Sequence, residues 1–304
     1  MNNLEKWILA ARPKTLPAII SPVIVGNIFV MKQFPTKFNY LIGFVTLLSA
    51  LLIQIGTNFV NDLYDFYKGS DTKERKGPIR VVSAGLVTPK QMQFAIYFVF
   101  TLAFVLGLIL VYSLEIKYHK GLYLLVVGIL SIIFAYIYTA GPFPLAYNGL
   151  GDISAIVFFG VIATLGSFFV HTGELNMTLF VISIALGMLI DNILVVNNYR
   201  DYYEDKKNNK RTLIVILGEK SGLYLYLFNN IFAIAILLIF RYTKLAPLAY
   251  YLFPFDIALL FLAIRNFVFM KKHKGVDLNI LLGETSKYLL FYSFIMSINI
   301  IIGG

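Results

Sequence analysis

The stretch MTLFVISIALGMLIDNILVVNNYRDYYED, from Met177 to Asp205, joins a long apolar segment to a polar, acidic end. Its apolar part, Met177–Asn197, is long enough for a helix to cross the hydrocarbon core of a bilayer, which takes about 20 residues. A spanning segment must satisfy its own backbone hydrogen bonds, and a helix does so. The stretch therefore predicts a transmembrane helix that ends in a cluster of polar side chains.

Apolar segments of this kind recur along the whole chain of 304 residues. Hydrophobic residues make up 59% of the chain and charged residues 14%, whereas soluble domains average about 45–50% and 25%. We therefore predict a single all-α, polytopic membrane domain over residues 1–304 with about nine transmembrane helices. The predicted spans are Thr15–Met31, Tyr40–Asn61, Gln91–Tyr112, Gly121–Tyr138, Gly149–Val170, Met177–Asn197, Leu223–Phe240, Leu245–Leu262 and Ser286–Ile302.

Basic residues predict the orientation of these spans. Most of the 26 Lys and Arg residues lie in connections on the same side as the N-terminus. Cytoplasmic loops carry the Lys and Arg excess, so we expect a multi-pass protein of the cell membrane with its N-terminus in the cytoplasm. This bias accounts for most of the formal net charge of +10, and no nucleic-acid partner is expected. The chain has no Cys, which excludes disulfides and thiolate metal sites.

Two acidic stretches follow the second and the sixth predicted span and hold seven of the 16 acidic residues. The first reads NDLYDFYKGSDTKE, from Asn61 to Glu74, and the second reads NNYRDYYED, from Asn197 to Asp205. Both contain Asn-x-x-x-Asp, and residues four apart lie on one face of a helix. Four predicted spans separate the stretches, which suggests two four-helix units that face each other, with a ninth helix added.

The two stretches have the residue types of a magnesium and diphosphate site. Carboxylate, carboxamide and water oxygens suit Mg²⁺, which is commonly held by one or two carboxylates together with substrate phosphates. Basic side chains suited to phosphate oxygens surround both stretches, namely Lys68, Arg75, Arg80, Arg200, Lys206 and Arg211. The alternative interpretation is a solvated surface on which acidic and basic side chains balance one another.

Further polar residues lie near the acidic stretches or within them. Gln54 and Asn58 precede Asn61 on roughly the same helix face, Asp191 lies inside the sixth predicted span, and Asn198 is the second residue of the second stretch. Acidic residues within a membrane span are candidates for function. We predict that these four residues line a cavity shared with the acidic stretches, with hydrogen bonding between helices as the alternative role.

Several segments resemble the UbiA superfamily of intramembrane prenyltransferases, and most closely its MenA branch, the 1,4-dihydroxy-2-naphthoate polyprenyltransferases of menaquinone synthesis. The resemblance covers about the first 220 residues. The segments that carry it are ARPKTLPAIISPVIVGN (Ala11–Asn27), NDLYDFYKGSDTKERKGPIRVVSAGLVTPKQ (Asn61–Gln91), YTAGPFPLAYNGLGD (Tyr138–Asp152), FFGVIATLGSFFVHTG (Phe158–Gly173) and NNYRDYYEDKKNNKRTLIVILG (Asn197–Gly218).

The chain departs from the family pattern at two places. Phe143 stands in the Gly-Pro-x-Pro turn where the branch often has a Lys, so a basic contact there is missing or is supplied elsewhere. The acids Asp62, Asp65 and Asp71 are also spaced more widely than the Asp-x-x-x-Asp of many superfamily members, although the wider form occurs in this branch.

The resemblance implies a role for each of the candidate residues. The expected catalytic and metal-binding residues are Asn61, Asp62, Asp65, Asp71, Asn197, Asp201 and Asp205. The expected diphosphate-binding residues are Lys68, Arg80 and Arg200, together with Tyr138 as a donor to the leaving oxygen.

The implied reaction is Mg²⁺-dependent transfer of a polyprenyl chain from its diphosphate to 1,4-dihydroxy-2-naphthoate, with loss of CO₂, in contact with membrane lipid. One alternative keeps the family and changes the acceptor to a 4-hydroxybenzoate, a homogentisate or a lipid glycerol. A second alternative is a secondary transporter, in which the paired motifs would mark an ion site. Transporter sites lie near the bilayer midplane, however, whereas these motifs lie at the ends of their predicted spans.

Overall fold

The computed structural model describes residues 2–69, 77–244 and 249–303, and this part of the chain is almost entirely helical. The α-helices are α1 (Asn3–Ala11), α2 (Pro17–Gln33), α3 (Tyr40–Tyr67), α4 (Pro89–Tyr118), α5 (Gly121–Ile137), α6 (Gly151–Ser154), α7 (Ala163–Thr172), α8 (Met177–Arg200), α9 (Tyr202–Lys207), α10 (Leu213–Leu217), α11 (Glu219–Lys244), α12 (Phe253–Lys272) and α13 (Leu278–Gly303). A π-helix, η3 (Ala155–Ile162), joins α6 to α7, and 3₁₀ turns occur at η1 (Pro13–Thr15), η2 (Leu145–Tyr147), η4 (Ala249–Leu252) and η5 (Gly275–Asp277).

The helices confirm a multi-pass membrane protein. Within the described residues, seven helices are long and apolar enough to cross a bilayer. An eighth span results if α1, η1 and α2 count as one span, bent by 59° between Thr15, where η1 ends, and Pro17, where α2 begins. The predicted count of nine would also need α5, whose 17 residues are apolar but fall below that length.

The bounds of the last two predicted spans were wrong. The predicted span Leu245–Leu262 corresponds to α12, which begins at Phe253 because Pro254 is tolerated in the first turn of a helix but not in its interior. The predicted span Ser286–Ile302 corresponds to α13, which begins at Leu278. Hydropathy missed the first turns of α13 because Glu284 lies there. Glu284 is paired with Arg265 of α12.

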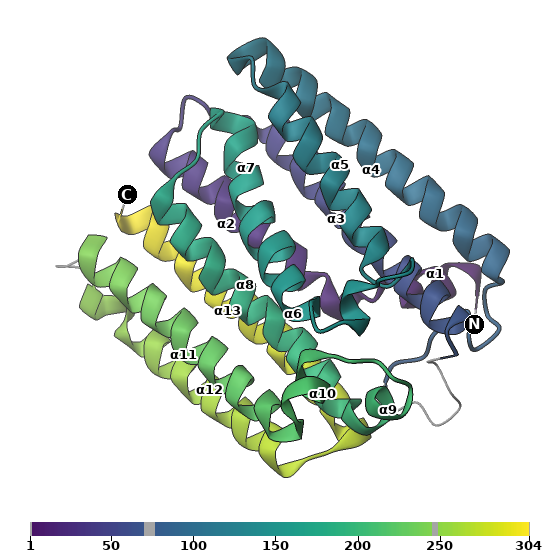
Figure 1. The fold of residues 1–304 in the computed structure, drawn as a ribbon. Helices are drawn as coiled ribbons and strands as arrows, with labels where there is room; N and C mark the ends of the chain where they lie inside the picture. Colours follow the sequence, from purple (N-terminus) through teal and green to yellow (C-terminus); the bar gives the residue numbers. More distant parts are fainter. Residues whose placement is uncertain (1, 70–76, 245–248, 304) are drawn as a thin grey trace.

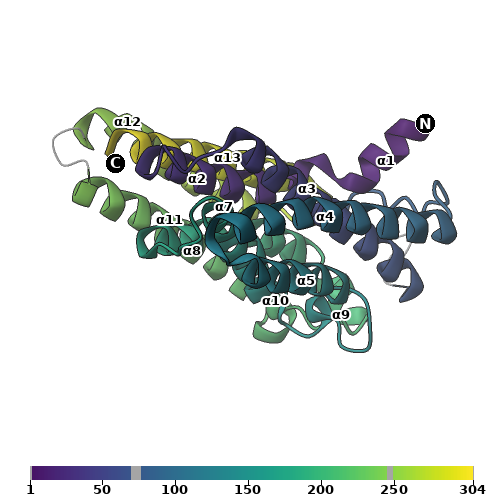
Figure 2. The ribbon, with the colours of Figure 1, turned by 90° about the horizontal axis from the view of Figure 1, so that it is seen from above.

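The long helices lie side by side and pack against one another in one bundle (Figure 1). α3 packs against α4, α2 against α7, and α8 against both α11 and the π-helix η3. The last helix, α13, lies inside this arrangement and contacts α2, α8 and α12. Viewed from above, α1 projects from the helix bundle at the N-terminus (Figure 2). The two helices that carry the acidic motifs, α3 and α8, therefore belong to one bundle.

One close contact between backbones positions the cavity wall. A Cβ built on Gly160 of η3 would lie 2.4 Å from the Cα of Gly187 in α8. Small residues allow this approach between helices in a membrane, where dispersion contacts drive packing. η3 is a π-helix, a form often found at functional sites.

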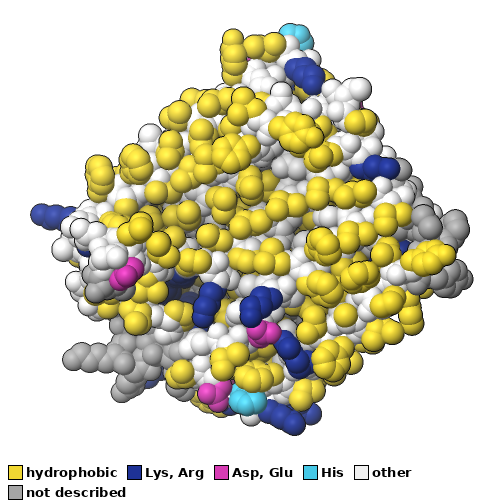
Figure 3. All heavy atoms as spheres, turned by 180° about the vertical axis from the view of Figure 1, so that it is seen from behind, with side chains coloured by type: hydrophobic (Ala, Val, Ile, Leu, Met, Phe, Trp, Pro, Cys, Tyr) yellow, Lys and Arg dark blue, Asp and Glu magenta, His cyan; other side chains and the backbone are white. Residues whose placement is uncertain are grey.

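The surface matches a lipid environment. Apolar side chains cover most of the face seen in Figure 3, and charged side chains gather mainly toward its lower part. Large hydrophobic residues on α4 and α5 are exposed, including Phe94, Phe98, Tyr112 and Leu122. A bilayer supplies an apolar solvent for such a surface.

Candidate active site

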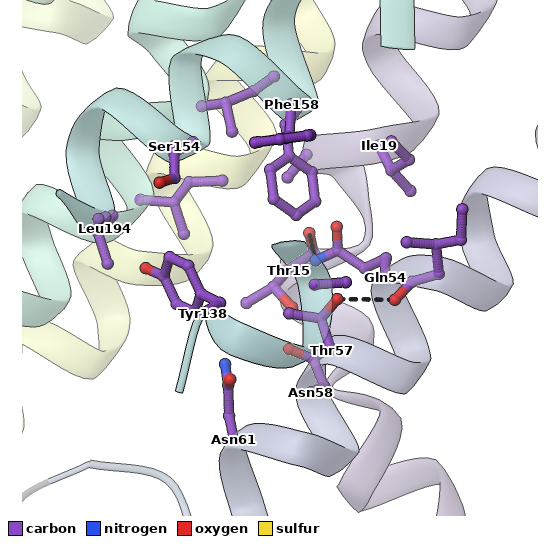
Figure 4. A pocket seen from close by; sticks show the side chains of 18 of the residues that line it. Thr15, Ile19, Gln54, Thr57, Asn58, Asn61, Tyr138, Ser154, Phe158 and Leu194 are labelled. Atoms are coloured by element: carbon purple, nitrogen blue, oxygen red, sulfur yellow. Dashed lines mark hydrogen bonds between the residues drawn. The ribbon is translucent and has the colours of Figure 1, made fainter. Parts of the chain in front are cut away.

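A cavity of about 540 Å³ lies between the N-terminal bend, α2, α3, α5, the η3–α7 segment and α8. On α3 its lining residues run from Thr46 to Asp65, about 28 Å along the axis at 1.5 Å rise per residue. In Figure 4, Asn61 lies at one side of this space and Phe158 at the other, with Tyr138 pointing into it. The cavity is therefore long and extends from the motif ends of the helices into the apolar bundle.

The two ends of the cavity differ in chemistry. We call the charged end the polar mouth, which comprises Asn61, Asp65, Arg80, Asn197, Arg200, Asp201, Asp205 and Lys210. We call the opposite end the apolar end, which comprises Leu110, Leu124, Phe158, Ile162, Gly166 and Val170. A ligand that fits both ends would carry an anionic head group and a long hydrocarbon tail.

In the first motif, Asp65 is the central acid. One carboxylate oxygen accepts from the Arg80 guanidinium at 2.8 Å, and the other accepts from the Tyr147 hydroxyl at 2.7 Å. Asn61, one turn earlier on the same face, accepts from the Thr139 hydroxyl. These contacts hold two oxygen ligands of α3 toward the polar mouth.

Asp62 does not line the cavity. Its two carboxylate oxygens accept from the backbone N–H groups of Val81 at 3.1 Å and Val82 at 3.0 Å. This places Asp62 as the anchor of the loop that brings Arg80 to Asp65, and not beside the other predicted metal ligands. Asp71, a further predicted ligand, lies outside the described residues.

In the second motif, Arg200 and Asp201 form a two-pronged ion pair. The Arg200 Nε and Nη2 atoms donate to the two oxygens of Asp201 at 2.7 and 2.6 Å, and Nη1 donates to Asn279 at 2.8 Å. The buried guanidinium, 4% exposed, is thus held by groups from two helices. Such a fork has donors matched in geometry to carboxylate or phosphate oxygens.

Asp205 lies one helical turn after Asp201, on α9. Lys210 forms an ion pair with the Oδ1 atom of Asp205 at 3.3 Å, whereas the Oδ2 atom is buried and has no hydrogen-bond partner in the part of the chain that the structure describes. Burial raises the pKa of the Asp205 carboxyl to about 6. Burial also acts to lower the pKa of Lys210, but Asp205, Asp65 and Asp201 outweigh it and raise that pKa.

Tyr147 joins the two motifs, and the sequence analysis did not single it out. The Lys68 ammonium of the first motif lies 4.0 Å from the centre of the Tyr147 ring, and the Lys210 ammonium lies 5.5 Å from it. The backbone N–H of Arg211 donates to the Tyr147 carbonyl at 3.1 Å. Tyr is common at the membrane interface, so the sequence did not distinguish Tyr147 from an ordinary interfacial residue in a loop between spans. Lys68 itself does not line the cavity and donates to the Thr139 carbonyl.

Gln54, Asn58 and Asn198 line the cavity, and Asp191 does not. The Asn58 amide donates to the Ala11 carbonyl at 2.9 Å, and the Gln54 amide donates to the Thr15 carbonyl at 3.4 Å. Both residues thereby tie α3 to the bend between α1 and α2. The placement of Asp191 on the cavity wall was wrong because Asp152 occupies that position in front of it.

The polar mouth has donors that suit Mg²⁺ but does not form a complete protein cage. Within the described ranges, no three acidic or His side chains converge closely enough to hold a metal ion by themselves. Mg²⁺ keeps water and phosphate ligands and needs only one or two carboxylates from the protein. The unpartnered Asp205 Oδ2 atom and the nearby Asp65 and Asp201 carboxylates fit that requirement.

Comparison with known proteins gives one consistent result. Residues 19–295 match the UbiA prenyltransferase family. The 1,4-dihydroxy-2-naphthoate octaprenyltransferase of Haemophilus influenzae is 30% identical over 302 residues, covering 99% of this chain and 97% of that protein. The enzyme of the same name from Escherichia coli is 37% identical over 219 residues, covering 72% of this chain and 70% of that protein.

A solved structure supports the same fold. The UbiA homologue of Archaeoglobus fulgidus bound to GPP and Mg²⁺ superimposes with a TM-score of 0.66 at 16% identity, covering 97% of this chain and 99% of that chain. At this identity the similarity concerns the arrangement of the helices.

Proposed function

The chain belongs to the UbiA prenyltransferase family and is a prenyltransferase, and we propose that it transfers a polyprenyl chain from its diphosphate to 1,4-dihydroxy-2-naphthoate. The observation that carries the proposal is the cavity, whose mouth joins acidic and basic residues of two distant motifs and whose other end is apolar. The names of the two octaprenyltransferases support this acceptor and a long prenyl donor.

The diphosphate would bind at the polar mouth. Arg200 is buried, Arg80 and Lys210 are partly buried, and carboxylates already position all three cations, so they can contact phosphate oxygens with little reorganisation. The Nε and Nη2 atoms of Arg200 form the two-pronged pair with Asp201, and they would become free to donate to one phosphate group once Asp201 binds the metal. The prenyl chain would extend along α3 into the apolar end.

Mg²⁺ would be held by Asp65, Asp201 and Asp205, together with the amide oxygens of Asn61 and Asn197. When bound it would neutralise charge that develops on the leaving diphosphate. Arg80 and Lys210, which pair with these carboxylates in its absence, would then be available to the phosphate oxygens. Acidic and basic residues of the mouth would thus serve the metal and the diphosphate respectively.

The chain would also control the carbon–carbon bond-forming step. Breaking the prenyl C–O bond gives an allylic cation that must be kept from water. Phe134, Phe158 and Phe159 line the cavity beyond the mouth, and aromatic faces attract cations. Tyr138 points into the cavity beside them and can donate to the leaving oxygen (Figure 4). The aromatic acceptor would attack at its carboxylate-bearing carbon and lose CO₂.

The distribution of Lys and Arg supports a cytoplasmic location for the polar mouth. The soluble acceptor would then enter from the cytoplasm and the prenyl donor from the surrounding lipid. Both substrates would meet where the cavity changes from polar to apolar.

An acceptor panel tests the proposed function. Purified protein is given Mg²⁺, octaprenyl diphosphate and, in separate reactions, dihydroxynaphthoate, 4-hydroxybenzoate, homogentisate or a glycerol phosphate. Mass spectrometry should detect a prenylated naphthoquinol that has lost CO₂, and EDTA should abolish it until Mg²⁺ is restored. Product from another acceptor alone would refute the proposed acceptor, and transfer that persists in EDTA would refute the metal requirement.

The Mg²⁺ requirement should depend on pH through Asp205. A carboxyl group with a pKa of about 6 is protonated below that pH and then cannot bind a cation. The Mg²⁺ concentration for half-maximal activity should therefore rise about tenfold between pH 7.5 and pH 5, since proton and metal compete for one carboxylate. The same Mg²⁺ titrations with Asp205→Asn protein control for protonation of the diphosphate. An equal rise of the half-maximal Mg²⁺ concentration in that variant would contradict the role of Asp205 as a metal ligand.

The apolar end should select the length of the prenyl chain. Gly166 lines this end, and a Cβ placed on it would meet no atom within 4 Å. Gly166→Leu should lower the transfer rate with octaprenyl diphosphate about tenfold, because overpacking costs about 1–3 kcal/mol. The transfer rate with the shorter geranyl diphosphate should be unchanged. Gly283→Leu, at an open position outside the cavity, is the matched control. Equal losses with both donors would show that Gly166 does not border the prenyl chain.

A further inference from the structure

Two buried acids lie apart from the polar mouth, and the proposed chemistry there does not use them. Asp152 begins α6 and is 4% exposed, and Asp191 lies in the middle of α8 and is 2% exposed. Their carboxyl groups hydrogen-bond to each other. The groups that act on them from adjacent elements are Asn229 of α11 and the Tyr138 hydroxyl, and in the described ranges neither acid forms an ion pair with a Lys or Arg.

The pair is held from one side and open on the other. The Asn229 amide donates to Asp191 Oδ2 at 3.0 Å and to the amide oxygen of Asn192 at 3.1 Å. Among the residues that the structure describes, no donor reaches the buried Oδ1 atom of Asp152. Asp152 lines the cavity and Asp191 stands behind it. The arrangement therefore presents one acid to a ligand and supports it with a second.

Two neighbouring carboxyl groups away from solvent do not both ionise readily, because like charges repel in a medium of low dielectric constant. One shared proton satisfies the hydrogen bond between them and leaves a single negative charge. Such a pair can accept a second proton and release it again. Unpaired buried charge in a membrane protein is costly, which favours a functional role over an accidental one.

The position along the cavity indicates what the pair would contact. Gly151 and Asp152 lie in sequence between Tyr147 of the mouth region and Phe158 of the apolar end. A Cβ on Gly151 would lie 3.2 Å from the Tyr138 hydroxyl, and Tyr138 is near enough to Asp65 to interact with it electrostatically. In Figure 4, Tyr138, Ser154 and Leu194 lie together on this wall, opposite Thr15 and Gln54. The pair thus adjoins the place where head group and tail of a prenyl donor would meet.

We propose that Asp152, supported by Asp191, is the general base that removes a hydroxyl proton from the aromatic acceptor. This inference rests on the proposed function. The acceptor O–H bond breaks, its proton passes to Asp152, and the electron pair stays on the ring oxygen. The C–O bond of the prenyl donor breaks, its electron pair leaves with the diphosphate, and the charged oxygen raises the electron density of the ring carbon, which bonds to the first carbon of the allylic cation.

The remaining steps return the proton. The attacked ring carbon loses its carboxylate as CO₂, and the electrons of that bond restore the aromatic ring with a charged ring oxygen. Asp152 then gives the proton back to this oxygen. The pair therefore carries a proton during catalysis and ends unchanged. In this scheme Asp191 is a positioning residue.

Asp152→Asn tests the proposal, with transfer to dihydroxynaphthoate measured anaerobically between pH 7 and pH 10. General-base catalysis contributes about 10²–10⁴-fold, so kcat at pH 7 should fall by about 100-fold or more. Phenolic hydroxyl groups ionise near pH 10 without a base. Raising the pH from 7 to 10 should therefore increase kcat of the Asp152→Asn protein at least about tenfold. Mg²⁺-dependent binding of a non-cleavable prenyl thiodiphosphate should be unchanged, because the polar mouth is intact.

Asp277→Asn makes the same change at an exposed position outside the cavity, so it is the matched control and should keep wild-type kcat and pH dependence. Asp191→Asn should lower kcat and shift the pH profile while keeping donor binding. Loss of donor binding in Asp152→Asn, a loss of transfer that is equal at every pH, or unchanged transfer would each overturn the role of Asp152. If wild-type protein prenylated no aromatic acceptor, the proposed function itself would fail, an outcome separate from any variant.

Discussion

Replacing Asp65 by Asn is expected to lower prenyl transfer at least about 1,000-fold. Asp65 is the acid of the first motif that faces the polar mouth, and it also holds Arg80 and Tyr147. Removing its charge weakens the metal site and releases the guanidinium that would contact the diphosphate. Metal and cation stabilisation of the leaving group is worth several kcal/mol, and each 1.36 kcal/mol is a factor of ten in rate.

The measurement is kcat with saturating dihydroxynaphthoate and a titration of Mg²⁺, on protein shown to be folded by its elution and thermal transition in detergent. Asp277→Asn is the control, because Asp277 is exposed, precedes α13 and does not line the cavity. This control should retain activity within about twofold, as is usual for surface substitutions of small effect. Activity in the Asp65→Asn protein above one tenth of wild type would rule out its role in the metal site.

Replacing Arg200 by Lys should lower kcat/KM for the prenyl diphosphate about 100-fold. Arg200 makes three hydrogen bonds in one plane, two to Asp201 and one to Asn279. An ammonium group is a point charge and cannot reproduce that fork, so both the orientation of Asp201 and the two-donor contact to phosphate would be lost. Two charge-assisted hydrogen bonds at about 1.5 kcal/mol each correspond to this factor.

Arg265→Lys provides a matched comparison. Arg265 pairs with Glu284 and is 45% exposed on its side chain, and it does not line the cavity. Exposed ion pairs contribute about 1 kcal/mol or less, so this variant should behave like wild type. The measurement is kcat/KM of both variants at varied concentrations of the prenyl diphosphate. Equal activity of the Arg200→Lys protein and wild type would mean that Arg200 supports the structure without contacting the diphosphate.

The sequence was sufficient for much of the fold because a bilayer imposes a simple rule. Spanning helices must be long and apolar, and seven of the predicted segments correspond to helices within a few residues. The bounds around α12 and α13 were wrong because Pro254 fixes the start of α12 and because Glu284 lies in the early turns of α13. In the folded chain Glu284 pairs with both Arg265 and Lys287, contacts that a sliding average of hydropathy cannot represent.

The candidate site was only partly predictable. The Asn-x-x-x-Asp spacing correctly placed Asn61 and Asp65 on one face of α3. It could not distinguish Asp65 from Asp62, because that depends on whether a carboxylate meets the cavity or the backbone of residues 81–82. Tyr147 and Asp152 were not distinguishable from ordinary loop and helix-start residues.

The sequence by itself determined that this chain is a helical membrane protein of the prenyltransferase type with acidic motifs at the ends of two spans. Helix length, apolar composition and motif spacing depend only on residues close together in the chain, so the sequence is sufficient to predict them. Only the tertiary structure decided that α13 packs inside the bundle, that Tyr147 joins the two motifs, and that Asp152 and Asp191 meet. Each of these depends on contacts between residues far apart in the chain, whose energies arise only when the helices pack together.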